Sequence, residues 1–459
     1  MTTLGLIGAG VMGRALAQNL ADRNVTVVVF DRDAAARSRA ADDARLVVVP
    51  SLGVLLGKLP KPRAVLLMVN AGRPVESAIA DLRPHLERGD IIVDGGNSEW
   101  RDTQRRTADL AKEGLDFVGL GVSGGEEGAR RGPAMMAGGS EAAYTRIRPW
   151  LEAIAARTVD GTACADWFGP DAGGHFVKMA HNAIEYGVMQ AIAEATQILQ
   201  HGLGLSYPEM KREADGWAAG NRASYLLELT SDILGRADRE TGKPLLDVIA
   251  DRAGMKGTGG WAVEAALSLG VAVPTLTEAV FARTLSGQPE RKSVVERLGA
   301  PVKKGDAKTK SDLGDALFAA TLVCYAQGFQ LIKAGAAAHG WVKDLGRAAR
   351  VWQAGCILRA KFLTDITAAY SAEPELPHLL ASPAFATIVA ACEPAWRRTV
   401  AFAASQGIAA PVLASSLSYL DAMRTAKGAT SMIQALRDGF GRHGFERVDK
   451  PGTHHAEWS

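Results

Sequence analysis

Cysteine is scarce in this chain, and the few cysteines lie far apart. Only four of the 459 residues are cysteine (Cys164, Cys324, Cys356 and Cys392), and none belongs to a CxxC pair. This spacing argues against a disulfide scaffold and against a zinc site of paired thiolates, and it fits a reducing compartment. We therefore expect a cytoplasmic protein that holds no metal.

Net charge and long apolar runs are missing as well. The 52 Lys and Arg residues nearly balance the 50 Asp and Glu residues, so the formal net charge of +2 predicts neither a nucleic-acid nor a membrane partner. The first residues, MTTLGLIGAG, contain no basic segment before an apolar one, and no apolar run reaches membrane-spanning length. What remains is a globular protein, long enough for more than one domain.

Short apolar runs alternate with helical stretches in the first third of the chain. Near-continuous apolar runs are typical of strands buried on both faces of a parallel sheet. We expect such strands at residues 4–8, 25–30, 45–49, 64–69, 91–96 and 116–122. The segments between them, such as 11–22 and 73–88, are long enough for crossover helices. Residues 1–172 are therefore predicted to form a doubly wound α/β domain.

The pattern changes after GPDAGG (169–174). Helical periodicity follows, with no convincing strand, and residues 173–430 are predicted to be all-helical. We expect long helices at 175–202, 314–338, 344–370, 384–406 and 411–426. EYGVMQAIAEA and CYAQGFQLIKA read as weakly related copies. Residues 431–459, rich in glycine and charge, are predicted to be an extended tail.

A GxGxxG pattern, formed by Gly8, Gly10 and Gly13, follows the first strand and opens the first helix. This context is the one that a Rossmann-like dinucleotide site requires: a tight turn, close approach of a pyrophosphate, and close helix–sheet packing. After the second strand, Asp31 favours the ribose hydroxyls of NAD, whereas Arg32 favours the 2′-phosphate of NADP. These residues alone favour NAD slightly.

The stretch KMAHNAIEY places Lys178, His181, Asn182, Glu185 and Tyr186 on one face of a helix. A lysine with a depressed pKa could act as a general base, and a glutamate two turns away could act as an acid. The spacing is equally compatible with a surface ion pair beside a structural histidine. From the spacing alone, both interpretations stay open.

Two loops follow strand ends, where open α/β sheets bind ligands. Asn97 and Ser98 come after one strand, and Ser123, Gly124 and Gly125 come after the next. Backbone N–H groups of the second loop could bind an anion, although a plain glycine turn would look the same.

Further along, isolated polar residues stand on loops and in the tail. They are Lys256 and Thr258 in MKGTGGW, Arg283 near a helix end, and Arg437 and His443 in the tail. Each alone is most simply read as an ordinary surface residue.

Taken together, these motifs resemble the decarboxylating 6-phosphogluconate dehydrogenases of the pentose phosphate pathway. The similarity runs through GLIGAGVMGRALAQNLA, IIVDGGNSEW, GVSGGEEGARRGP, GGHFVKMAHNAIEYG, MKGTGGW, EAVFARTLSG and FERVDKPGTHHAEWS, and so covers essentially the whole chain. It implies oxidation of 6-phosphogluconate by NADP, or NAD, with loss of CO₂ to give ribulose 5-phosphate. It also implies that Lys178 is the general base and that Glu185 is the acid that protonates C1.

The resemblance further implies two binding sets and a homodimer whose tails reach into the partner's site. The substrate set is Asn97, Ser123, Gly124, Gly125, His181, Asn182, Tyr186, Lys256, Thr258, Arg283, Arg437 and His443. The cofactor set is Gly8, Ala9, Gly10, Val11, Met12, Gly13, Asp31, Arg32, Asp33, Val69, Asn70 and Asn97.

Three differences from the family pattern concern charge. The family commonly has Asn-Arg-Thr at residues 31–33, lysine at Asn70 and lysine at Gly260. The changes at Asp31 and Asn70 remove features that favour a 2′-phosphate, so we expect a weakened NADP preference and use of both cofactors.

Two alternatives remain. A shorter β-hydroxyacid dehydrogenase would share the glycine motif and the lysine but not the tail. A non-catalytic dinucleotide-binding protein of the same fold would be expected to lose Lys178 or Glu185.

Overall fold

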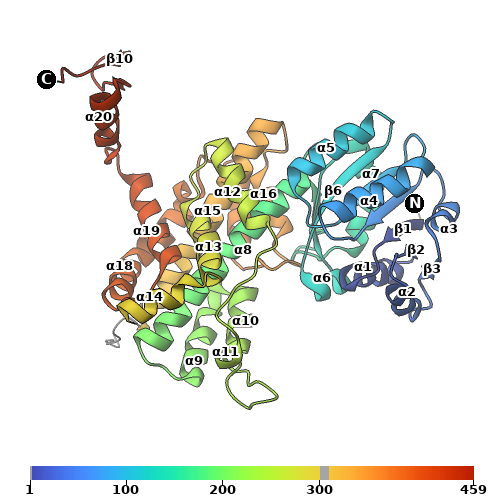
Figure 1. Ribbon diagram of the computed structural model, residues 1–459, viewed down its shortest axis with the longest axis horizontal. Coiled ribbons are helices and arrows are strands. Elements are labelled where there is room, and N and C mark those ends of the chain that lie inside the picture. The colour runs from blue at the N-terminus through green and yellow to red at the C-terminus, as the bar shows by residue number, and fades with distance from the viewer. Residues whose placement is uncertain (1–2, 300–309, 459) are drawn as a thin grey trace.

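The computed structural model describes residues 3–299 and 310–458. Figure 1 shows an α/β domain at one side, a helical domain beside it, and helix α20 projecting from the far end of the helical domain. The α/β domain is built on an eight-stranded sheet in the order β3-β2-β1-β4-β5-β6-β7-β8. This arrangement confirms the predicted fold class.

Six strands of the sheet match the six predicted apolar runs. They are β1 (Thr3–Ile7), β2 (Thr26–Phe30), β3 (Val47–Val48), β4 (Ala64–Leu67), β5 (Ile91–Asp94) and β6 (Asp116–Ser123), all parallel. The sequence interpretation missed β7 (Ala134–Ala137) and β8 (Ala165–Trp167). Strand β7 runs antiparallel to β6, so the sheet is mixed at this edge.

Helices cover the two faces of this sheet (Figure 1). They are α1 (Val11–Asp22), α2 (Ala34–Ala41), α3 (Leu52–Gly57), α4 (Arg73–Leu82), α5 (Trp100–Ala111), α6 (Gly125–Arg131) and α7 (Glu141–Ile154). Crossover helices between parallel strands explain why the strands are apolar on both sides.

The helical domain begins with α8 (Gly173–Gln197). It continues with α9 (Tyr207–Trp217), α10 (Tyr225–Leu234), α11 (Leu245–Val248), α12 (Thr258–Leu269), α13 (Pro274–Ser286), α14 (Glu290–Leu298), α15 (Leu313–His339), α16 (Leu345–Val351), α17 (Leu363–Ala372), α18 (Pro383–Ser405) and α19 (Pro411–Arg424). The single helix expected at 344–370 is wrong, because α16 and α17 are separated by residues 352–362. Gly355 there has φ +69°, which ends helical continuation, and its carbonyl accepts the N–H of Ala134.

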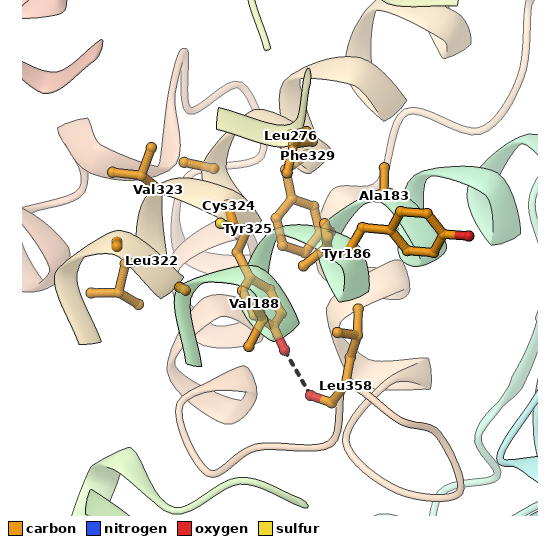
Figure 2. Packing of buried hydrophobic residues seen from close by; sticks show 14 of the residues in the cluster. Ala183, Tyr186, Val188, Leu276, Leu322, Val323, Cys324, Tyr325, Phe329 and Leu358 are labelled. Atoms are coloured by element: carbon orange, nitrogen blue, oxygen red, sulfur yellow. Dashed lines mark hydrogen bonds between the residues drawn. The ribbon is translucent and has the colours of Figure 1, made fainter. Parts of the chain in front are cut away.

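Helices α8 and α15 form the centre of the helical core. Figure 2 shows Tyr325 of α15 inside this cluster, where its hydroxyl donates to the carbonyl of Leu358 at 2.7 Å. By length and composition α15 could cross a membrane, although the sequence predicted no such run. However, 83% of its apolar window is buried inside the protein, as expected for the core helix of a globular domain.

The tail is more ordered than the sequence predicted. It contains helix α20 (Thr430–Gly441) and a small antiparallel pair, β9 (Phe445–Glu446) with β10 (Thr453–His454). The tail extends from the helical domain as predicted (Figure 1), but α20 and the β9–β10 pair were not predicted. Hydrogen bonds within the segment replace the apolar core that it lacks.

Candidate active site

The glycine motif forms a cradle between β1 and α1. Gly8 has φ +102°, and a Cβ there would lie 2.5 Å from the carbonyl oxygen of Met68, whereas a Cβ on Gly13 would lie 1.8 Å from that of Gly8. A Cβ on Gly10, by contrast, would meet nothing within 4 Å. Gly10 is also the N-cap of α1, which has no capping side chain and no acidic residue in its first turn. The first N–H groups of α1 therefore face open space, as a pyrophosphate site requires.

The acidic residues after β2 are hydrogen-bonded to the backbone. Asp31 accepts the Ala9 N–H at 2.6 Å with one oxygen and the Asp33 N–H at 2.9 Å with the other. Asp33 caps α2 by accepting the N–H of Ala35. Arg32 points to α4 and pairs there with Asp81 at 2.5 Å. Both carboxylates thus support the loop, and the guanidinium already has a carboxylate partner.

Helix α8 lies directly on the sheet because β6 carries glycine at the contact. A Cβ on Gly121 would lie 2.4 Å from the Cβ of Lys178, and one on Gly119 would lie 2.8 Å from Nδ1 of His175. Gly174 at the start of α8 is equally tight against the carbonyl of Met136. This packing brings the polar face of α8 to the carboxyl end of the sheet.

That polar face joins the two strand-end loops. Nε2 of His181 lies 3.2 Å from Oγ of Ser123, and its Nδ1 lies 3.2 Å from Oδ1 of Asn182. The amide of Asn182 donates to Oδ1 of Asn97 at 3.3 Å. Residues of three separate segments therefore form one continuous polar wall, and the interpretation as a solvated surface face is wrong.

Burial sets the protonation of this wall. Lys178 is only 8% exposed, and desolvation lowers the pKa of its amine, although the charge of Glu185 acts in the opposite direction. Desolvation raises the pKa of Glu185, opposed by Lys178 and Arg283. The pKa of His181 is well below its usual value, because of burial first and the nearby Lys178 second. Burial thus shifts the pKa of each of these three groups in the direction that stabilises its uncharged form.

A positively charged side chain, Arg283 of α13, lies beside the wall beyond Glu185. The guanidinium of Arg283 lies 3.5 Å from the ring centroid of Tyr186, and it donates to the carbonyl of Gly254 at 3.3 Å. Gly259 packs against the same ring, where a Cβ would lie 2.8 Å from Cε2 of Tyr186. Its neighbour Thr258 is buried at the first position of α12. Arg283 is therefore held beside a helix N-terminus, an arrangement suited to an anion.

Comparisons with known proteins agree along the whole chain. Residues 3–169 match the NAD binding domain of 6-phosphogluconate dehydrogenase, and residues 174–458 match its C-terminal domain. The decarboxylating, NADP(+)-dependent 6-phosphogluconate dehydrogenase of Bacillus subtilis is 44% identical over 99% of this chain and 98% of its own. The chain belongs to the 6-phosphogluconate dehydrogenase family.

Other members of the 6-phosphogluconate dehydrogenase family are similarly close. The decarboxylating enzyme of Schizosaccharomyces pombe is 45% identical over 97% of this chain and 93% of its own. The solved structure of the Plasmodium falciparum enzyme, studied in its apo form, with NADP+ and with 6-phosphogluconate, is 34% identical. It superposes with a TM-score of 0.95, covering 99% of this chain and 100% of that one.

Three of the predicted substrate residues stand apart from the wall. Lys256 is exposed on the loop before α12. Arg437 and His443 are exposed in the tail segment that projects from the helical domain (Figure 1). Within one chain, the polar wall and the adjoining Arg283 are therefore supplied by the loop after β5, the end of β6, α8 and α13, without the tail.

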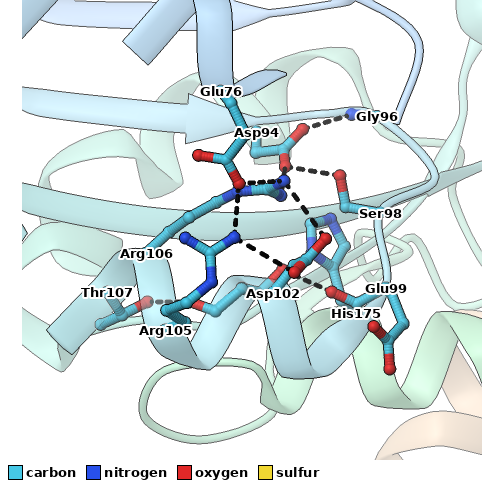
Figure 3. A network of polar contacts seen from close by, with 11 residues as sticks. Glu76, Asp94, Gly96, Ser98, Glu99, Asp102, Arg105, Arg106, Thr107 and His175 are labelled. Carbon is cyan, nitrogen blue, oxygen red and sulfur yellow. Dashed lines mark hydrogen bonds and ion pairs between the residues drawn. The ribbon is translucent and has the colours of Figure 1, made fainter. Parts of the chain in front are cut away.

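A buried ion-pair network behind the Asn97 loop was missed by the sequence interpretation. Asp94 is fully buried at the end of β5, where it accepts the N–H of Gly96 and the hydroxyl of Ser98. Arg106 of α5 lies 3.4 Å from this carboxylate and 3.0 Å from that of Glu76 (Figure 3). The network fixes the loop that carries Asn97. In sequence, RDTQRR reads as a solvated helix face, so only burial identifies Arg106.

Metal ligands do not gather near this wall. Over residues 3–299 and 310–458, no group of three or more His, Cys, Asp or Glu side chains is placed to hold a metal ion.

Proposed function

We propose that this chain catalyses the NADP-dependent oxidative decarboxylation of 6-phosphogluconate to ribulose 5-phosphate. The observation that carries the proposal is the buried face of α8, which brings Lys178 and Glu185 together beside the strand-end loops, and burial there lowers the pKa of the lysine and raises that of the glutamate. Both shifts are toward neutral pH, as a general base and a general acid require.

The residues of the cradle fit a dinucleotide. Gly8 and Gly13 allow the tight turn, Gly10 leaves room for a phosphate, and the uncapped N-terminus of α1 supplies N–H groups. NADP held by this cradle would supply the acceptor for the hydride of C3. Arg32 is the cation available to a 2′-phosphate, and Asp81 competes for it. Use of NAD as well as NADP follows from that competition.

In the proposed sequence, Lys178 accepts the proton of the C3 hydroxyl as the substrate is oxidised. The resulting ammonium then hydrogen-bonds the C3 carbonyl oxygen and protonates it as the C1–C2 bond breaks and C1 leaves as CO₂, which stabilises the negative charge that develops there. Glu185 delivers a proton to the former C2, which becomes C1 of ribulose 5-phosphate, while Lys178 takes back the proton of the enediol oxygen.

The other residues of the wall bind and orient the substrate. We assign the carboxylate and hydroxyl groups to Ser123, His181, Asn182 and Asn97, which are already linked by hydrogen bonds. We assign the phosphate to Arg283 and its neighbours, because guanidinium groups bind phosphate in a bidentate manner. Linked donors of this kind are organised before the substrate arrives.

A homodimer is the proposed working form. Helix α20 projects from the helical domain and exposes four apolar side chains, which are Met432, Ile433, Leu436 and Phe440. They lie within roughly one third of the helix circumference, since an α-helix has 3.6 residues per turn. An apolar stripe on a projecting helix requires a partner surface. A second copy of this chain, receiving Arg437 and His443 near its own Arg283, satisfies that requirement.

We also assign the protein to the cytoplasm. All four cysteines are free and buried, which fits a compartment that keeps thiols reduced. We divide it into domains at 1–172 and 173–430, followed by the tail at 431–459.

Steady-state turnover tests the proposed reaction. The purified protein is mixed with 6-phosphogluconate and NADP or NAD, while reduced nicotinamide and CO₂ are both measured. Equal amounts of the two products are expected. Oxidation of a shorter β-hydroxyacid without CO₂ release would favour the alternative dehydrogenase, and binding of NADP without any turnover would favour the non-catalytic alternative.

A further inference from the structure

The carboxylate of Asp438 is the centre of the tail. It is fully buried on α20, and four donors from the following residues converge on it. Oδ1 accepts the N–H of Gly444 at 3.0 Å and lies 2.7 Å from Nδ1 of His455. Oδ2 accepts the N–H of Ala456 at 2.9 Å and Nε1–H of Trp458 at 2.9 Å. One side chain thus ties together the turn after α20 and the last described residues.

Apolar burial cannot account for the shape of this segment. Among residues 430–458, all of which are described, only Asp438 and Gly444 are buried. The apolar stripe of α20 faces the opposite side, since Asp438 is roughly 180° around the helix from its centre at 3.6 residues per turn. Charge-assisted hydrogen bonds to Asp438 are therefore the main internal support of the tail.

The two chemically useful residues of the tail depend on this support. Arg437 precedes Asp438 on α20, and His443 stands in the turn between α20 and β9. The N–H of the next residue, Gly444, is bound to Asp438. Arg442 and Gly444 both have positive φ, so the turn is a conformation that needs such a tether.

We propose that Asp438 is a positioning residue for substrate binding, which preforms the tail so that Arg437 and His443 reach the partner's phosphate pocket together. The inference rests on the proposed function, in which the tail completes the site of a second copy. Asp438 itself does not touch the substrate, because its oxygens are occupied by the four donors.

Substitution within the tail tests the positioning role. Asp438→Asn keeps the shape of the side chain but replaces one carboxylate oxygen by an NH₂ group, which cannot accept hydrogen bonds from the two donors that face it. Trp458→Phe removes only the ring N–H that binds Asp438. For Asp438→Asn we expect the KM for 6-phosphogluconate to rise by about tenfold or more, because charge-assisted bonds are lost. The KM for NADP should stay within about twofold, and Trp458→Phe should show a smaller rise of the same kind. Asp449→Asn, an exposed tail aspartate paired with Arg447, is the matched control.

Mixed dimers then show where the tail acts. Lys178→Met protomers have intact tails, and Asp438→Asn protomers have intact lysines. In a dimer of one Lys178→Met protomer and one Asp438→Asn protomer, the intact tail of the first should reach the site of the second, which has an intact lysine. Such dimers should therefore recover turnover with a low KM, which neither variant shows alone.

The outcomes separate the two proposals. A parent protein that does not turn over 6-phosphogluconate refutes the proposed function. If the parent is active and Asp438→Asn has the same KM as the parent, the positioning role is overturned. It is also overturned if the Asp438→Asn dimer dissociates and activity is lost at every substrate concentration. Failure of mixed dimers to recover low-KM turnover overturns action on the partner.

Discussion

Glu194 is a buried carboxylate whose titration should make stability depend on pH. It is 1% exposed on α8, and its two oxygens accept the N–H groups of Val412 and Leu413, both at 2.9 Å, at the start of α19. Desolvation nevertheless raises its pKa to about 7, against the effect of these N–H groups and of Gln190. This carboxylate therefore caps the N-terminus of α19 (Pro411–Arg424).

The size of the effect follows from the pKa difference. The ordinary value is 4.5 and the folded value is about 7. At about 1.36 kcal/mol for each pH unit, the difference corresponds to about 3 kcal/mol. Since the folded state holds its proton more tightly, this stabilisation is fully present below pH 4.5, declines as the pH rises, and is lost above about pH 7.

The chain contains a neutral version of the same cap. In α15, Oε1 of Gln327 accepts the N–H groups of Thr275 and Leu276 at the start of α13, while its Nε2 donates to the hydroxyl of Thr275. The segments VAVPTL and IAAPVL enter α13 and α19 with similar backbone angles, φ −126° and ψ 51° at Val273 and φ −136° and ψ 57° at Ala410. This similarity supports a repeat in the helical domain.

Glu194→Gln should therefore keep the cap on α19 but remove the contribution of residue 194 to the pH dependence of stability. The free energy of unfolding of parent and variant is measured with urea and by heating at about pH 5 and about pH 8.5. Between these two pH values, the difference in free energy of unfolding between variant and parent should shift by about 2–3 kcal/mol in favour of the variant. Glu194→Gln with Val412→Thr, which reproduces the threonine acceptor, should be the more stable of the two variants. A parent–variant difference that is the same at both pH values would refute the reasoning.

Three further changes test the site. Lys178→Met should lower kcat by at least about a hundredfold while substrate binding, measured by calorimetry, persists, because a general base contributes about 10²–10⁴. Asp81→Asn should raise the ratio of kcat/KM for NADP to that for NAD by about two- to fivefold, since an exposed ion pair that occupies Arg32 is worth about 1 kcal/mol at most. Gly121→Ala adds a Cβ that would lie 2.4 Å from Lys178, and it should lower kcat by about tenfold or more.

The variants at Asp81 and Gly121 each have a control in the same chain. Asp109→Asn removes an exposed aspartate on α5 that pairs with Lys112, and it should leave the cofactor ratio unchanged. Gly128→Ala adds a Cβ whose nearest neighbour would be at 3.4 Å, and it should be nearly silent. Near-parental turnover of Lys178→Met would remove the lysine from the base role. A parental kcat for Gly121→Ala would show that α8 can shift away from β6 without loss of catalysis. An unchanged cofactor ratio for Asp81→Asn would show that the Arg32–Asp81 ion pair does not weaken the preference for NADP.

The sequence was informative wherever a local pattern determines the structure. Buried parallel strands leave continuous apolar runs, so six strands were predicted. The sequence interpretation missed β7, which runs antiparallel to β6, and the three-residue edge strand β8. The helix expected at 344–370 failed because the apolar pattern continues through a loop. That loop is held by a bond between Gly355 and Ala134, more than two hundred residues away.

For the site too, the local spacing of residues could be read from the sequence, but contacts between distant segments could not. Helical spacing correctly put Lys178, His181, Asn182, Glu185 and Tyr186 on one face of α8, but it could not tell a wall from a surface. That distinction depends on what packs against the helix from other segments, and residue spacing carries no such information. Arg106 was overlooked for the same reason, because its partner Asp94 is on a different element.

The shifted pKa of Lys178 belongs to the junction of the two domains, not to the lysine or its helix. From one side, Gly121 of β6 lies against the stem of the side chain. From the other, the loop between α16 and α17 brings the buried Cys356 close to the side chain. Removing either surface would return water to the amine and restore an ordinary lysine pKa. Lys178 therefore has a lowered pKa only while both domains pack against this part of α8. For this reason the helical domain alone, even correctly folded, should not abstract a proton at neutral pH.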